Sequence, residues 1–149
     1  MEIVISNAPY NRAAALSLRQ ATFVTERGIP RDVEFDDRDT PERLYVVAYQ
    51  RPELPVGTLR LEPQSDIEMR FGRVCTSQAA RGQGIGRQVL QAGEDWAKTH
   101  GFTSGVIDGE LTAKTFYERC GYHIVGEPFN EDGAPVVTLK KNLSHNSQM

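Results

Sequence analysis

The chain has 149 residues and a formal net charge of −3 at pH 7, a length that suits one domain with a core and a charge that argues against a general nucleic-acid binder. No apolar run approaches the roughly 20 residues of a membrane-spanning helix, and no basic-then-apolar signal segment opens the chain. The two cysteines form neither a disulfide framework nor a metal-ligand spacing, so we expect a cytoplasmic protein without a metal site.

The amino-terminal third predicts one strand, one long helix and an acidic segment. The strand covers residues 1–6, and the helix runs from Pro9, which suits a first turn, to about Glu26. One face of this helix is expected to carry Ala13, Leu16, Gln20 and Phe23. Residues 31–42 are polar and acidic, and three interpretations stay open for them: a short helix, an ordered loop or a solvated acidic connection.

The rest of the chain predicts alternating strands and helices. Residues 44–49 and 56–62 predict a hairpin, and residues 67–76 a further strand with a bulge at Gly72, where the apolar alternation slips. A helix begins at Ile85 and ends at His100-Gly101, followed by a strand at 102–107, a helix at 111–119 and strands at 122–125 and 135–140. This order predicts a mixed α/β fold in a single domain over residues 1–141, with a polar, flexible tail at 142–149.

A glycine-rich loop joins the strand that ends at Val74-Cys75-Thr76 to the following helix, and it reads RGQGIGR over residues 81–87. Glycine lets the backbone approach a ligand closely, and the first turn of a helix offers unpaired N–H groups that bind phosphates. The loop therefore predicts a phosphate site flanked by Arg81 and Arg87, the plain alternative being a tight turn at a helix start. Neither a Walker loop, which needs a Lys after the last glycine, nor a G-x-G-x-x-G dinucleotide fingerprint fits this spacing.

The spacing Arg81-x-x-Gly84-x-Gly86, directly after a strand, resembles motif A of the GNAT N-acetyltransferase superfamily, whose loop binds the pyrophosphate of acetyl-CoA. A second stretch, AKTFYERCGY over residues 113–122, resembles motif B of the same superfamily. The resemblance implies a mixed, mostly antiparallel central sheet that is flanked by helices and splayed at the cofactor strand. It also implies acetyl-CoA as co-substrate, bound by Val74, Cys75, Thr76, Arg81, Gly82, Gln83, Gly84, Ile85, Gly86, Arg87, Glu110 and Phe116.

The amino-terminal half resembles the small ElaA-like branch of this superfamily. The resemblance lies in the pattern FVTERGIPRDVEFDDRD over residues 23–39, and it extends to residues 126–135. The chain departs from the branch at Tyr45, Glu110 and Val136, where His, Gln and His are usual. An ionised Glu110 only accepts hydrogen bonds whereas Gln also donates, which affects its contact to the pantetheine arm. Tyr45 and Val136 change the acceptor side.

Acetyl transfer from a thioester to an amine needs an oxyanion donor, a base and an acid. The resemblance implies that Tyr117 protonates the departing thiolate. The backbone N–H of Thr76 is the candidate oxyanion donor, and Glu26 and Glu34 are the candidate bases, with Glu68 or Glu110 acting through water as further options. Cys75 and Phe116 also have a structural interpretation as core residues.

These observations predict an acetyl-CoA-dependent N-acetyltransferase that moves the acetyl group directly to the amine of a small molecule or peptide. The expected partners are acetyl-CoA and an amine acceptor, with a homodimer as one expected assembly and neither nucleic acid nor membrane involved. One alternative is a non-catalytic acyl-CoA-binding or regulatory module on the same fold, which the departures at Tyr45, Glu110 and Val136 motivate. A nucleotide-binding protein that uses the loop for ATP is disfavoured by the missing Lys after Gly86.

Overall fold

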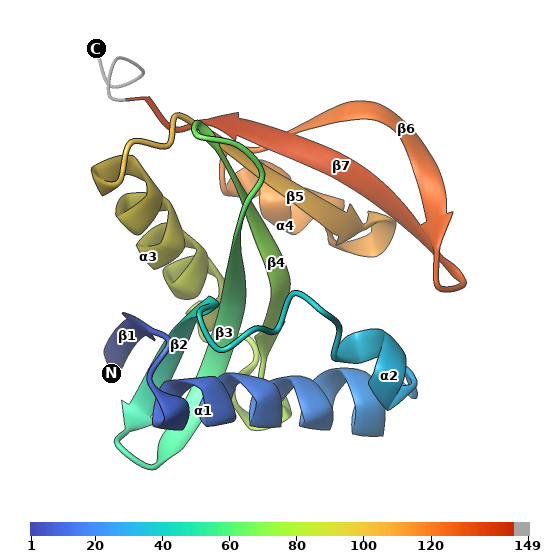
Figure 1. Cartoon of the computed structure of the whole chain (residues 1–149). Helices are drawn as coiled ribbons and strands as arrows, with labels where there is room; N and C mark the ends of the chain where they lie inside the picture. Colours follow the sequence, from blue (N-terminus) through green and yellow to red (C-terminus); the bar gives the residue numbers. More distant parts are fainter. Residues whose placement is uncertain (145–149) are drawn as a thin grey trace. The chain divides into compact units, whose positions relative to one another are not determined.

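The computed structural model describes residues 1–144 and has a mixed α/β fold, with a seven-stranded, mostly antiparallel sheet flanked by helices (Figure 1). The strand order is β1-β2-β3-β4-β5-β7-β6. The chain divides into two compact units, each described by itself: Met1–Glu62 with Arg73–Gly93, and Pro63–Gly72 with the chain from Glu94. The sheet and its helices confirm the predicted mixed α/β fold class and the predicted order of strands and helices. Among residues 1–144, no helix has the length and apolarity to cross a membrane.

The first unit contains an antiparallel hairpin and a long helical segment. Strands β1 (Glu2–Ser6), β2 (Leu44–Arg51) and β3 (Leu54–Pro63) pair in sequence, with β2 in the middle. Helix α1 (Pro9–Arg19) packs against β2 and continues as a π-helix, η1 (Gln20–Glu26). The predicted helix therefore has the correct extent, although the wider winding of its last two turns was not predicted.

The buried face of this helical segment is more polar than predicted. Ala13 is exposed, whereas the buried positions are Asn11, Ala15, Leu18, Arg19 and Thr22. Asn11 tolerates burial because its amide donates to the Tyr45 carbonyl oxygen at 3.0 Å and its oxygen accepts from the Tyr49 hydroxyl at 2.7 Å. A pattern search for apolar residues therefore misses part of the buried face, since three of its five buried positions carry polar side chains.

The acidic segment begins as a short helix, α2 (Arg31–Glu34), and is not a solvated connection. Glu34 is 2% exposed, and the Asp39 side chain is 6% exposed. Carboxylates are buried in this way only when cations pair with them. The interpretation as a solvated acidic connection is therefore wrong, and the cations are described below.

The second unit is built on three further strand pairs. Strand β4 (Glu68–Thr76), which belongs in part to each unit, pairs in parallel with β5 (Ser104–Glu110), while β7 (Ala134–Asn142) pairs antiparallel with β5 and with β6 (His123–Glu131). Helix α3 (Ile85–Thr99) is likewise shared by both units. Two short helical stretches, η3 (Leu111–Ala113) and α4 (Lys114–Arg119), replace the single predicted helix at 111–119.

The last described residues include the end of strand β7 and a buried leucine. Strand β7 reaches Asn142, and Leu143 is 1% exposed, with its side chain near Gly105. Residues 145–149 of the predicted tail lie outside the described residues.

Candidate active site

The glycine-rich loop lies between a short helical turn, η2 (Gln78–Ala80), and the start of α3. Gly82 and Gly84 have φ angles of 81° and 79°, in the left-handed region that side chains other than glycine rarely adopt. A Cβ atom at either position would meet no heavy atom within 4 Å, so the backbone conformation and not crowding selects glycine here. The two glycines therefore face open space. Helix α3 begins directly after the loop, and the Gln88 N–H donates to the Gly84 carbonyl oxygen at 3.2 Å. This geometry fits a phosphate group.

Arg81, at the first position of the loop, is held by a carboxylate from another element. Its Nη1 and Nη2 atoms each lie 2.7 Å from an oxygen of Glu26 at the end of η1, and its Nε donates to the Thr76 carbonyl oxygen at 3.3 Å. The hydrogen bonds from Arg81 lower the pKa of Glu26, and the same contact raises the pKa of Arg81. The fold thus brings together three of the predicted site residues, Glu26, Thr76 and Arg81.

The end of strand β4 supplies the other predicted residues of the first unit. Cys75 is 6% exposed, and burial raises the pKa of its thiol to about 12, with a partly opposing hydrogen bond to Thr22. A protonated, buried thiol is not a nucleophile, which confirms the structural interpretation of Cys75. Val74 and Thr76 are half-buried. Ile85, 6% exposed, packs over Gly57, where an added Cβ would lie 2.5 Å from its Cγ2.

The backbone of strand β4 is irregular at Arg73, one residue after the predicted bulge position Gly72. Arg73 has a φ angle of 52°, a left-handed conformation that costs a non-glycine residue about 1 kcal/mol or more. Its guanidinium donates to the backbone oxygens of Val33 and Glu34, at 3.3 and 3.2 Å from Nη2. The unusual backbone of Arg73 is thus associated with a side chain that holds the end of α2 against β4.

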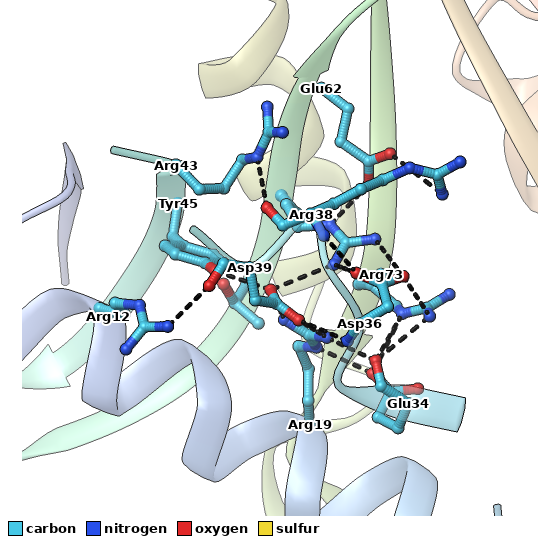
Figure 2. Close-up of polar contacts among 12 residues, drawn as sticks. Arg12, Arg19, Glu34, Asp36, Arg38, Asp39, Arg43, Tyr45, Glu62 and Arg73 are labelled. Carbon is cyan, nitrogen blue, oxygen red and sulfur yellow. Dashed lines mark hydrogen bonds and ion pairs between the residues drawn. The ribbon is translucent and has the colours of Figure 1, made fainter. Parts of the chain in front are cut away.

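A buried network of charges surrounds the acidic segment (Figure 2). Arg19 on α1 lies between two carboxylates, 2.8 Å from Glu34 and 2.7 Å from Asp39. Arg60 on β3 lies 3.1 Å from Asp39, and its other partners are Asp36 and Glu62, at 2.9 and 2.7 Å. Arg19 and Arg60 are each 1% exposed in their side chains. The predicted base candidate Glu34 therefore lies inside a network of ion pairs, with Arg73 as its second partner at 3.2 Å.

Asp39 and Tyr45 connect this network to strand β2. The Tyr45 hydroxyl donates to Asp39 at 2.7 Å (Figure 2). Burial opposes ionisation of Asp39, but the hydrogen bonds from Arg19 and Tyr45 outweigh it and hold its pKa well below the usual value. Burial together with the bond to Asp39 raises the pKa of Tyr45 to about 12. At the position where the ElaA-like branch has His, this chain thus has a neutral core tyrosine.

The second unit holds the predicted acid, Tyr117, on α4. Tyr117 is 8% exposed, and its ring meets those of Phe116 and Tyr122 edge-on, at centroid distances of 5.1 and 6.4 Å. Phe116 is 37% exposed, so its interpretation as a core aromatic is wrong. Glu110 ends β5 and pairs in register with Val136 on β7, which places two of the departures from the ElaA-like branch next to each other.

A polar triad around a buried glutamate in this unit was not predicted. Glu94 on α3 is 1% exposed and accepts from the Tyr122 hydroxyl at 2.7 Å and from Lys141 Nζ at 2.8 Å. Lys141 also donates to the Cys120 carbonyl oxygen at 2.8 Å, at the end of α4. These contacts support the helix that carries Tyr117. The only signal in the sequence is a Glu at an inward position of the helical repeat, which is usually a sign of a buried pair.

Gly109 on β5 leaves room for the ring of Tyr117. A Cβ atom at Gly109 would lie 2.7 Å from Tyr117 Cε2, too close for both to keep their places. We expect Gly109→Ala to lower the free energy of unfolding by about 1–3 kcal/mol, as overpacking does. In a double-mutant cycle, adding Tyr117→Ala removes the clash, so the two losses should sum to more than the measured loss of the double variant. Additive losses in urea unfolding would contradict this contact.

Comparisons with known proteins identify a family and a shared fold. Residues 19–143 match the sequence model of the acetyltransferase (GNAT) domain. A provisionally named N-acetyltransferase from Lactobacillus plantarum is 60% identical, with a TM-score of 0.94 over 95% of this chain and 97% of that chain. An acyl-CoA N-acyltransferase from Pseudomonas aeruginosa is 26% identical, with a TM-score of 0.81 over 94% and 98%. Escherichia coli ElaA, at 23% identity and a TM-score of 0.81 over 94% and 98%, shares the fold.

Proposed function

The chain belongs to the GNAT acetyltransferase family, and from that premise we propose that it transfers an acetyl group from acetyl-CoA directly to the amine of a small molecule or peptide. The observation that carries the proposal is the loop at residues 81–87. Two left-handed glycines, Gly82 and Gly84, leave open space at the start of a helix, and Arg81 and Arg87 add positive charge. This arrangement supports binding of the pyrophosphate of an acyl-CoA.

In this proposal the loop residues and the end of β4 hold acetyl-CoA, which supplies an activated thioester. Backbone N–H groups of residues 82–87 meet the phosphates, and the Thr76 N–H donates to the thioester oxygen. Phe116, exposed on α4, and Glu110 at the end of β5 contact the pantetheine arm. Ile85 and Cys75 contribute by packing, since both side chains are buried.

The chemistry needs two proton transfers. The acceptor ammonium first loses a proton to a carboxylate, and the free amine nitrogen then attacks the thioester carbon, forming a C–N bond while the C–S bond breaks. Tyr117 gives its phenolic proton to the leaving thiolate, which becomes the thiol of CoA. Between the two candidate bases, Glu26 is the better one, because its side chain is 34% exposed whereas that of Glu34 is 3% exposed and paired with Arg19 and Arg73.

Gly84→Glu tests the loop. The new carboxylate would stand where the phosphates bind, so we expect the affinity for CoA to fall below detection in calorimetry while circular dichroism shows a folded protein. Gly101→Glu is the matched control, because Gly101 also has a left-handed φ angle, 91°, and open surroundings but lies outside the loop. Full CoA affinity in a folded Gly84→Glu variant would refute this site.

A further inference from the structure

The ion pair between Glu26 and Arg81 occupies the cation that the proposed function assigns to the phosphates. Both partners are accessible, with side-chain exposures of 34% and 41%. They come from separate parts of the first unit, η1 and the glycine-rich loop, and are 55 residues apart in sequence. An anion in solution can therefore reach Arg81 and replace Glu26 as its partner while the protein stays folded.

The hydrogen-bond geometry lets one anion at a time occupy this fork of Arg81. A guanidinium has five N–H donors arranged in planar forks, and a fork matches a carboxylate or a phosphate equally well. In Arg81 the fork of Nη1 and Nη2 is filled by the two oxygens of Glu26, and Nε is turned to the Thr76 carbonyl oxygen. The same fork cannot bind a phosphate in the same way until Glu26 leaves it.

The negative charge of Glu26 also opposes phosphate binding at the loop. Glu26 neutralises Arg81 while it is bound, and a carboxylate that stays beside the loop repels the negatively charged pyrophosphate. The contact thus lowers the affinity of the loop for phosphates by removing one attraction and adding one repulsion.

We propose that Glu26 competes with the pyrophosphate of acyl-CoA for Arg81, so that cofactor binding displaces this carboxylate from the loop. This inference rests on the proposed function. Its consequence concerns the order of binding. Since hydrogen bonds from Arg81 lower the pKa of Glu26, its release returns the carboxylate to ordinary basicity, so Glu26 becomes a stronger base once acyl-CoA is bound. Acyl-CoA should therefore bind before the amine is deprotonated.

Calorimetry with CoA on Glu26→Gln measures the competition. We expect the variant to bind CoA about two- to tenfold more tightly than the wild type, with the gain shrinking at high salt, because an exposed charge pair is worth little and is screened. Pantetheine, which lacks the phosphates, should bind equally to both. Glu53→Gln is the matched control, since Glu53 also pairs with an arginine, Arg51, at 3.0 Å, and its removal changes the net charge equally. It should leave CoA affinity unchanged.

A double-mutant cycle with Arg81→Ala separates this inference from the proposed function. Arg81→Ala should lower the affinity for CoA. In the Arg81→Ala background, Glu26→Gln should no longer raise that affinity. Unchanged or weaker CoA binding by both Glu26→Gln and Glu26→Ala, with Arg81→Ala still harmful, would overturn the competition and leave the loop site intact. If Arg81→Ala and Gly84→Glu both left CoA binding unchanged, the loop assignment itself would be wrong.

Discussion

Tyr117→Phe should lower turnover about 10²- to 10⁴-fold, the usual contribution of a general acid, while the affinity for CoA changes little. The substitution keeps the ring that packs against Phe116, Tyr122 and the backbone of Gly109, so the helix and its neighbours remain in place. It removes only the proton donor. The measurement is steady-state thiol release with the best amine acceptor from a screen, together with calorimetric CoA affinity for both proteins.

Tyr122→Phe is the matched control for Tyr117→Phe. Tyr122 is another buried tyrosine of the same unit, 3% exposed, but its hydroxyl is bound to Glu94. Its loss should reduce stability by about 1–3 kcal/mol, because Glu94 loses a buried hydrogen bond, and should not reproduce the loss of turnover. Full activity of Tyr117→Phe would remove this phenol from the mechanism. A wild type that binds CoA yet releases no thiol with any amine would instead favour a binding module.

Arg19→Met should destabilise the protein by about 3–5 kcal/mol at pH 7, the usual cost of removing one partner from a buried ion pair. The methionine has no charge, so Glu34 and Asp39 lose their shared cation. Glu34 keeps Arg73 as a cation, and Asp39 keeps Arg60. Urea unfolding measures the loss. Arg51→Met, which breaks an exposed pair with Glu53, should cost about 1 kcal/mol or less.

The pH dependence of the stability of Arg19→Met tests whether the lost charge causes the destabilisation. Because the pKa of Asp39 is lowered in the folded protein, its ionised form stabilises the fold at neutral pH, and this stabilisation is lost as the pH falls below about 4. In Arg19→Met the pKa of Asp39 should rise toward its ordinary value. The stability difference between wild type and variant should therefore narrow between pH 5 and pH 3. A constant difference across this range would show that Arg19 acts by packing alone.

Much of the fold was predictable because local patterns specify it. The strands over 44–49 and 56–62 follow from runs of β-forming residues on either side of a proline-containing turn, and the helix from Ile85 follows from the helical spacing of its apolar side chains. The first helix shows where this fails: its inward positions include Asn11 and Arg19, which are buried only because distant groups satisfy them. Periodicity of apolar residues contains no information about such partners.

The candidate site likewise has features that were predictable from the sequence and features that were not. The positions of Gly82, Gly84 and Tyr117 were predictable from motif spacing, because the loop and the helix are each continuous in sequence. The pairing of Arg81 with Glu26 was not, and neither was the burial of Glu34, which had been one of two equivalent base candidates. A carboxylate in the sequence has the same formal charge whether it faces solvent or an arginine.

By itself, the sequence determined the order of strands and helices, the glycine-rich loop at residues 81–87 and the family to which the chain belongs, because each depends on stretches that are continuous along the chain. Only the tertiary structure decided which charges meet. Arg19 and Glu34 are 15 residues apart, Arg73 and Glu34 39, and Arg81 and Glu26 55. Ion pairs depend on distances of a few ångströms and on desolvation, and both arise only when the elements pack together.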